Sequence, residues 1–296
     1  MFSRPPAGWL PKIVLAPSVG ATFIYVFVFS AWTFYISLSN STLLPSYDFV
    51  GFEHYVDLWT NRRWKLGYLN LLFFGTFYVI GTMAVGLLLA SFLDRGIRGE
   101  SIWRTIILYP LAVSFVVTGV VWSWLFHPNT GIEHFVRTFG WADFTFDWIV
   151  HRDYAIYPII LTGIWHSSGF AMVLFLAGMR SVDRDLIRAA RIDGAGSLRI
   201  YWRIVLPAIR PIAVAVAVVL LQFAIKTFDL VLALTNGGPG IATTVPAIYV
   251  YDVMFQRGQI AQGAAAAVMI LLTLAVALAP YGFWVVWRRR KGEALV

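Results

Sequence analysis

Ionisable side chains occur inside long apolar stretches of this sequence. Lys226 and Asp229 lie three residues apart, so they would be neighbours on one face of a helix. A charged group within a membrane is costly and marks either a mutual ion pair or contact with a polar ligand. The sequence therefore predicts an intramembrane pair between Lys226 and Asp229, with contact to a hydroxylated ligand as the alternative.

A second polar group interrupts another apolar stretch, at Trp165-His166-Ser167-Ser168-Gly169. Hydroxyl, imidazole and aromatic groups together suit a hydrated path for a polar solute. Serine and histidine side chains can equally be satisfied by hydrogen bonds to their own helix. Both interpretations stay open from the residues alone.

Catalytic and metal-binding patterns do not emerge from the sequence. It contains no cysteine, which excludes disulfides, thiolate zinc sites and thiol nucleophiles. It has no HExxH motif, and neighbours such as Glu133 and His134 are usually solvated. Asp143 and Asp147 lie in a loop between apolar segments, where water or another protein would meet them. We predict no enzymatic activity, no metal and no cofactor bound by this chain.

The elements that must position these residues are apolar and long. The composition is 59% hydrophobic with only 13% charged residues, and the mean hydropathy is +0.73. A membrane-spanning helix needs about 20 predominantly apolar residues. Six segments qualify, and we predict an all-α membrane protein with one transmembrane domain over residues 1–296 and these spans: 13–38, 67–93, 105–126, 155–179, 208–234 and 260–287.

Orientation follows from the loops. The segments on one side of the predicted spans carry 16 of the 23 Lys and Arg residues, and those on the other side carry 6. Because positive residues stay on the cytoplasmic side, we predict that both termini are cytoplasmic in the inner membrane of a prokaryote. The net charge of +8 has the same origin, and it indicates contact with membrane lipid rather than nucleic acid.

The longest basic loop, at 180–207, predicts a short helix on the membrane surface. Asp183 suits a helix N-cap, and Gly194 and Gly196 suit its end. Pro207 and Pro211 would begin the next helix. Small and apolar residues form one stripe of the short helix, namely Leu186, Ala189, Ala190 and Asp193. Such a face fits a groove on a partner protein, with lipid headgroups as the alternative surface.

The same segment resembles the coupling signature of binding-protein-dependent ABC importers. That signature reads Glu-Ala-Ala, three residues, Gly, nine residues, Ile, one residue, Leu-Pro. Matching spacings hold for Ala189, Ala190, Asp193, Gly194, Ala195, Ile204, Leu206 and Pro207. One position departs from the family, because Arg188 replaces the glutamate that helps engage the ATPase.

A second stretch is similar to carbohydrate-uptake permeases of the maltose type. It includes Phe228-Asp229, Leu234–Pro239, Ala242-Thr243 and Tyr249–Phe255. The resemblance implies a type I importer permease that moves a sugar by alternating access. It further implies a second related permease, a cytoplasmic ATPase homodimer and an extracytoplasmic sugar-binding protein. The chain lacks a GxxxxGK[ST] loop, so ATP and Mg would bind to the separate ATPase.

The resemblance also suggests where sugar contacts would fall. Trp165 aligns with a tryptophan of the larger membrane subunit of the maltose system. On that register the family's sugar-contacting positions are Gly163, His166, Ser167, Phe170, Leu220, Ala224 and Thr227. Gly163, Leu220 and Ala224 offer no polar side chain, which implies a different ligand or a site carried mostly by the partner permease.

Three other functions remain as alternatives. An ABC permease for a non-sugar solute would share the coupling segment but not the stretch after residue 228. An integral membrane enzyme would need a clustered acid, base or metal set. A stand-alone secondary transporter would have no use for a coupling helix.

Overall fold

The computed structural model describes residues 9–44 and 46–290. Its regular elements in this range are helices, with one isolated β-bridge between Ser39 and Phe49. They are α1 (Trp9–Phe23), η1 (Ile24–Val28), α2 (Phe29–Ser37), α3 (Glu53–Thr60), α4 (Arg62–Leu93), α5 (Glu100–Ala112), α6 (Phe115–Leu125), α7 (Ile132–Thr138), α8 (Ile156–Ser181), α9 (Arg184–Ile192), α10 (Ser197–Ile200), η2 (Tyr201–Val205), α11 (Leu206–Ala208), α12 (Arg210–Ile225), α13 (Phe228–Thr235), α14 (Pro246–Tyr251), η3 (Asp252–Gln256) and α15 (Ile260–Arg290).

The predicted membrane helices have counterparts in this order. Four helical segments are long and apolar enough to cross a membrane, namely Lys12–Ser37, Arg62–Leu93, Ile156–Ser181 and Ile260–Phe283. Two bent pairs raise the number to six if each counts as one span, namely Glu100–Ala112 with Phe115–Leu125 and Ser197–Ala208 with Arg210–Ile225. The all-α membrane fold predicted from the sequence is confirmed.

The predicted span 105–126 is not one straight helix. It is broken between α5 and α6, which meet at 97°. Val113 is extended there, and the hydroxyl of Ser114 accepts a hydrogen bond from the Val117 amide, 3.3 Å away. The apolar run continues through the bend, so hydropathy alone could not reveal it.

The predicted span 208–234 is also interrupted. Helix α12 ends at Ile225 and α13 begins at Phe228, so the segment is two helices. Pro207 lies in the first turn of the short helix α11, which continues the helical run Ser197–Ala208, whereas the span itself begins with α12. A π-helical turn, η2, precedes this proline, whose missing N–H already disturbs the regular helical ladder. Pro211 does occupy the first turn of α12, as predicted.

The chain forms two compact units, each described here by itself. The first contains the described residues up to Asn61 together with Tyr249–Leu272, and the second contains Arg62–Ile248 and the described residues from Thr273. The prediction of one permease domain over 1–296 stays a prediction.

The first unit is held by backbone and hydroxyl contacts. The Ala261 amide donates to the Ser41 carbonyl over 2.9 Å, and the hydroxyls of Ser37 and Tyr55 are 2.6 Å apart. The small residues at the start of α15 are buried, and a Cβ on Gly263 would lie 2.8 Å from the Met254 Cβ. These small residues therefore serve close packing, as predicted.

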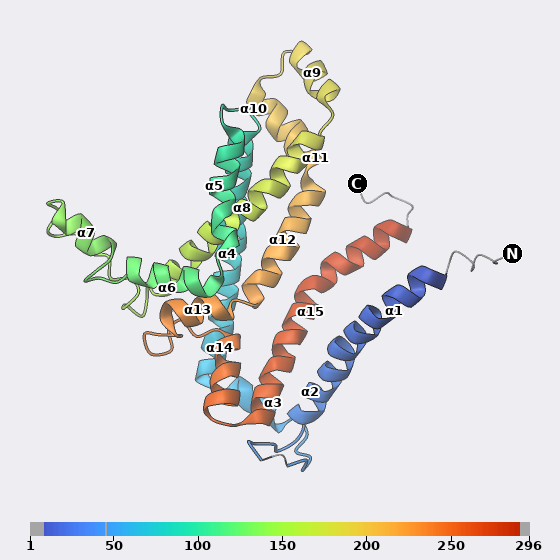
Figure 1. The fold of residues 1–296 in the computed structure, drawn as a ribbon, viewed down its shortest axis with the longest axis vertical. Helices are drawn as coiled ribbons and strands as arrows, with labels where there is room; N and C mark the ends of the chain where they lie inside the picture. The colour runs from blue at the N-terminus through green and yellow to red at the C-terminus, as the bar shows by residue number, and fades with distance from the viewer. Residues whose placement is uncertain (1–8, 45, 291–296) are drawn as a thin grey trace. The chain divides into compact units, whose positions relative to one another are not determined.

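The second unit packs around α4 and α8, with α12 beside both (Figure 1). Glycines allow the close approach of these helices. A Cβ on Gly86 of α4 would lie 2.5 Å from the Ala171 Cβ of α8. Helix α6 packs against α13 in the same way, where a Cβ on Gly119 would lie 2.6 Å from the Ala233 Cβ.

Candidate functional site: the α9 segment and the broken spans

Helix α9 has the boundaries that the sequence predicts. The Asp183 carboxylate accepts a hydrogen bond from the Asp185 amide over 2.8 Å and caps the first turn. The helix closes before Gly194, whose φ is +79°, a conformation that favours glycine. Gly196 does not end α9 as predicted. Its φ is −67°, and it is the residue just before α10.

Apolar side chains on and after α9 are open to the surroundings. Ile192, Leu198 and Trp202 are 86%, 72% and 64% exposed. Leu186 and Ala189 are exposed as well, and Ala190 is half-buried. Most of the predicted docking stripe on α9 is therefore not covered by other parts of this chain. Exposed apolar side chains also continue beyond α9, at Leu198 and Trp202.

Leu198 and Trp202 also line a recess of about 480 Å³ beside α9. Its other lining residues are Gly194, Gly196, Arg199 and Arg203. Sequence reasoning missed Trp202, although a tryptophan within a basic loop was a usable signal. Large aromatic side chains and arginines are the residues that most often dominate protein interfaces.

The second half of the signature has a different environment. Ile204 and Leu206 are half-buried and pack against the apolar core of the second unit. Pro207, next to them, is half-buried too. The signature thus combines an uncovered helix with an anchor in the body of the unit.

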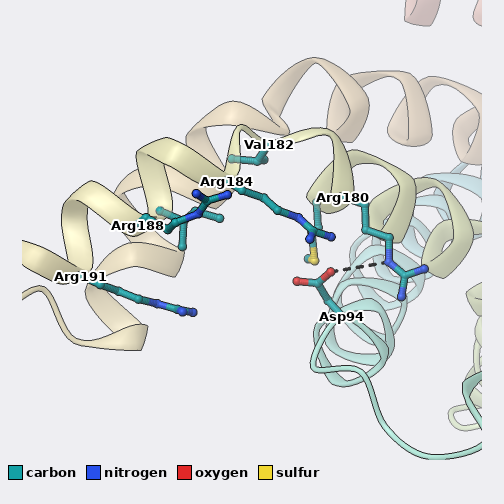
Figure 2. Close-up of a pocket in the computed structure, with 8 residues that line it drawn as sticks. Asp94, Arg180, Val182, Arg184, Arg188 and Arg191 are labelled. Carbon is teal, nitrogen blue, oxygen red and sulfur yellow. Dashed lines mark ion pairs between the residues drawn. The ribbon is translucent and has the colours of Figure 1, made fainter.

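Ion pairs join the end of α8, just before α9, to the end of α4 and to α5. The Arg180 guanidinium at the end of α8 is 2.8 Å from the Glu100 carboxylate and 3.8 Å from the Asp94 carboxylate. Glu100 also pairs with Arg104 on α5. Figure 2 shows Arg180 facing Asp94 at the end of α4. Arg180 belongs to α8, so these pairs link the ends of α8 and α4 and the start of α5 at the point where the chain enters α9.

Arg188, at the position of the family's glutamate, stays within its own helix. Its guanidinium is 3.1 Å from the Asp185 carboxylate, and both side chains are largely exposed. The substitution therefore presents positive charge where the family presents negative charge.

His166 and Ser167 are buried inside the chain. The His166 Nε2 donates to the Val113 carbonyl over 2.9 Å, and its ring stacks on Phe115 with centroids 4.0 Å apart. This contact holds the bend between α5 and α6. The Ser167 hydroxyl accepts from the Tyr78 hydroxyl over 2.7 Å.

The other positions suggested by the family register are enclosed as well. Leu220, Ala224 and Thr227 are buried, and Phe170 packs against Phe223 with ring centroids 6.0 Å apart. A Cβ on Gly163 would lie 3.0 Å from the Tyr78 ring. None of these positions lines the recess beside α9, the recess where α6 meets α13, or the recess between α9 and the ends of α4 and α8.

Lys226 and Asp229 do not pair in the part of the chain that the structure describes. No ion pair within 4.0 Å joins them, and both are exposed. The spacing argument assumed a continuous helix, whereas Lys226 follows the last residue of α12 and Asp229 belongs to α13.

A further recess of about 430 Å³ lies where α6 meets α13. Sequence reasoning did not find it, because its residues come from distant segments. They are Ser123, Trp124, His127, Ile149, Val150, Leu232, Ala233, Leu234, Thr235, Asn236, Gly238 and Pro239. Among the described residues, no group of three His, Cys, Asp or Glu is placed to hold a metal ion.

A bundle of apolar helices with a capped surface helix between two spans has the architecture of a multi-pass transport permease. Residues 82–290 match the family described as the binding-protein-dependent transport system inner membrane component. The chain belongs to this family of ABC transporter permeases.

Curated relatives cover nearly the whole chain. A probable ABC transporter permease of Pyrococcus horikoshii is 38% identical over 93% of this chain and 96% of its own. The xylose/arabinose import permease XacH of Haloferax volcanii is 33% identical over 96% of this chain and 88% of its own. The sn-glycerol-3-phosphate permease UgpA of Escherichia coli is 31% identical over 90% and 91%.

The fold also matches a solved structure. A bacterial ABC transporter that imports the acidic polysaccharide alginate contains a chain with a TM-score of 0.81 and 21% identity. The match covers 95% of this chain and 96% of that one. At this identity the similarity establishes the fold alone.

Proposed function

We propose that this chain is a permease subunit of an ATP-driven importer that moves a sugar or sugar derivative across the cytoplasmic membrane. The observation that carries the proposal is α9, a capped helix with an uncovered apolar stripe at the spacings of the coupling signature. The relatives XacH and UgpA, which are named for xylose/arabinose and glycerol-3-phosphate, support the choice of substrate class.

The partner for α9 is an ATPase homodimer that binds ATP and Mg. Leu186, Ala189 and Ala190 would enter its groove, with Trp202 at the edge of the contact. Closure of the two ATPase subunits would displace α9, and the ion pairs of Arg180 would pass the displacement to α4 and α5. The chain supplies the path and the lever, and performs no covalent chemistry.

The solute path involves a second, related permease. Lys226 and Asp229 are exposed at the break between α12 and α13, where a partner subunit or a solute can reach them. His166, Ser167, Phe170 and Thr227 are enclosed, which supports a path carried largely by the partner in this conformation. An extracytoplasmic binding protein would deliver the sugar near the recess at α6 and α13.

The proposed orientation places both termini and α9 in the cytoplasm. It rests on the distribution of Lys and Arg among the loops. Single cysteines test it, because the chain has none of its own. Cysteines at Ser46 and Asn129 should react with an impermeant maleimide from outside, and one at Ser197 only from inside.

The whole proposal is tested with the purified complex of both permeases, the ATPase and the binding protein. ATP hydrolysis is measured with binding protein loaded from a panel of pentoses, hexoses, oligosaccharides, glycerol-3-phosphate, amino acids and polyamines. We expect stimulation by at least one sugar or sugar derivative. Stimulation only by amino acids or polyamines would establish the non-sugar alternative. Failure of the chain to copurify with any ATPase would refute the coupling role.

A further inference from the structure

A third recess, of about 260 Å³, lies between α9 and the ends of α4 and α8. Figure 2 shows its position under α9. Its lining residues are Asp94, Met179, Arg180, Val182, Arg184, Ile187, Arg188 and Arg191. It faces the body of the second unit, so it is distinct from the apolar stripe that the coupling role uses.

The charges around this recess do not balance. Four arginines line it against the single carboxylate of Asp94. Arg180 pairs with Asp94 and Glu100, and Arg188 pairs with Asp185. Arg184 and Arg191 form no ion pair within 4.0 Å with any residue that the structure describes.

Helix geometry brings these arginines together. Arg184, Arg188 and Arg191 follow one another at i, i+4 and i+7, which places them on one face of α9. Ile187 on the same face packs against the apolar core, so the face is turned toward the recess. Figure 2 shows Arg184 extending from α9 toward the end of α4. Like charges at this spacing repel, and a bound anion would remove that cost.

We infer that this recess binds a phosphate-bearing anion, either the headgroup of an anionic phospholipid or free phosphate. Guanidinium groups hold phosphate through paired N–H donors, which makes arginine suited to such a site. The volume is below the roughly 300–1,000 Å³ typical of pockets for drug-sized ligands, so a headgroup fits better than a whole nucleotide.

The position favours access from the membrane surface. Asp94 follows directly after α4, and Met179 and Arg180 belong to the last turn of α8. Both helices are candidate spans, so their ends lie at the depth of lipid headgroups. A ligand bridging α9 to these ends would restrain the helix that the ATPase must move.

The test measures binding to the purified full-length chain in a neutral detergent. Dihexanoyl phosphatidylglycerol, dihexanoyl phosphatidylcholine and inorganic phosphate are titrated separately by microscale thermophoresis. The test variant is Arg184→Gln with Arg191→Gln. The matched control is Arg199→Gln with Arg203→Gln, which removes the same charge from the neighbouring recess.

We expect the test variant to bind the anion at least tenfold more weakly, because two arginine side chains that donate charge-assisted hydrogen bonds to it are removed. The control should stay within about twofold of the wild type, as expected where only distant, screened charge is removed. Phosphatidylglycerol affinity that phosphatidylcholine and phosphate do not match identifies a lipid site. Phosphate affinity with the same loss in the test variant identifies a free-phosphate site.

Equal losses in the test and control variants would refute the site, because they would reflect general charge attraction. Equal binding of phosphatidylcholine and phosphatidylglycerol, without phosphate binding, would also refute it. If the double variant does not purify, Arg191→Gln against Arg199→Gln gives the same comparison with one charge removed. The readout uses the permease alone, so its result is independent of sugar transport and of the ATPase.

Discussion

The α9 segment and the family's sugar positions differ in the exposure of their side chains. Leu186 and Ala189 of α9 and Trp202 of η2 are exposed, and the cap at Asp183 and the glycine at 194 set the ends of α9. On α8 and α12, His166 and Leu220 are enclosed by their own chain. The first region is therefore accessible to the proposed partner, whereas the second already contributes to the stability of the unit.

The largest expected effect concerns Trp202. Replacing an exposed interface tryptophan with alanine typically costs about 2–4 kcal/mol of binding free energy. Trp202→Ala should therefore reduce copurification of the ATPase strongly. Trp124→Ala is the matched control, because Trp124 is 68% exposed at the other recess. Equal ATPase retention in both variants would show that the docking surface does not extend beyond α9.

His166→Leu tests whether the enclosed region is structural. The change leaves the Val113 carbonyl at the bend without its donor, at a cost of about 1–3 kcal/mol. We expect a lower midpoint of thermal unfolding in detergent and less assembled complex. Thr227→Leu is compared in parallel, since no side-chain hydrogen bond involves its hydroxyl in the described residues. Normal assembly with altered sugar preference in His166→Leu would instead place His166 on the solute path.

Gly194→Val tests the uncovered region without adding a clash. No atom lies within 4 Å of a Cβ built at Gly194 or at Gly196, but only Gly194 has a positive φ. The left-handed conformation costs a side chain about 1–2 kcal/mol, so Gly194→Val should distort the end of α9. Gly196→Val should have little effect. The measurement is sugar-stimulated ATP hydrolysis by the whole complex, and equal activity of the two variants would contradict a role for the helix end.

Lys226 and Asp229, at the break between α12 and α13, test whether charged residues beside the buried region interact with each other. Because the structure shows no ion pair between them, Lys226→Met and Asp229→Asn should have additive effects on stability. The expected coupling free energy is below about 0.5 kcal/mol, the usual deviation for independent sites. A double variant that is more stable than either single variant would restore the intramembrane pair.

The smallest expected effect on folding concerns Arg188. Its pair with Asp185 is exposed, and such helical pairs contribute about 0.3–0.5 kcal/mol. Arg188→Glu should therefore hardly change the thermal midpoint. Its effect on ATPase stimulation is the informative value, because an ATPase adapted to a basic residue should couple less well to the variant. Unchanged stimulation would show that this side chain points to solvent in the complex.

The sequence predicted the apolar helices and the ends of α9 because those features are local. Asp183, Gly194 and Pro211 each act through the backbone of their own turn. The break at Val113 could not be predicted from hydropathy, because apolar residues flank it on both sides. The break between α12 and α13 falls on the polar residues Lys226 and Thr227, which the sequence analysis took to lie within one continuous helix. At the first break, the freed Val113 carbonyl is satisfied by His166, which lies 53 residues further along the chain.

The candidate site was predictable to a similar extent. The stripe on α9 follows from helical spacing, whereas the exposure of Trp202 depends on how η2 turns after the glycines. The arginine-lined recess required knowing that α9 returns over the ends of α4 and α8. Helical spacing places Arg184, Arg188 and Arg191 on one face, but the sequence analysis did not consider them and spacing does not show what that face meets.

The sharp boundaries of α9 have a consequence for how such importers diversify. Helix α9 begins at the aspartate that caps it and ends at its own glycine, so its boundaries are set within the segment itself. Such a segment can be exchanged between related permeases as one unit. We propose that transplanting Asp183–Gly194 into a related permease would transfer the surface proposed to meet the ATPase, because in this chain the anchoring residues Ile204 and Leu206 lie outside the transplanted segment. If the proposed docking role holds, ATPase recognition and substrate recognition would lie on separate segments and could change independently.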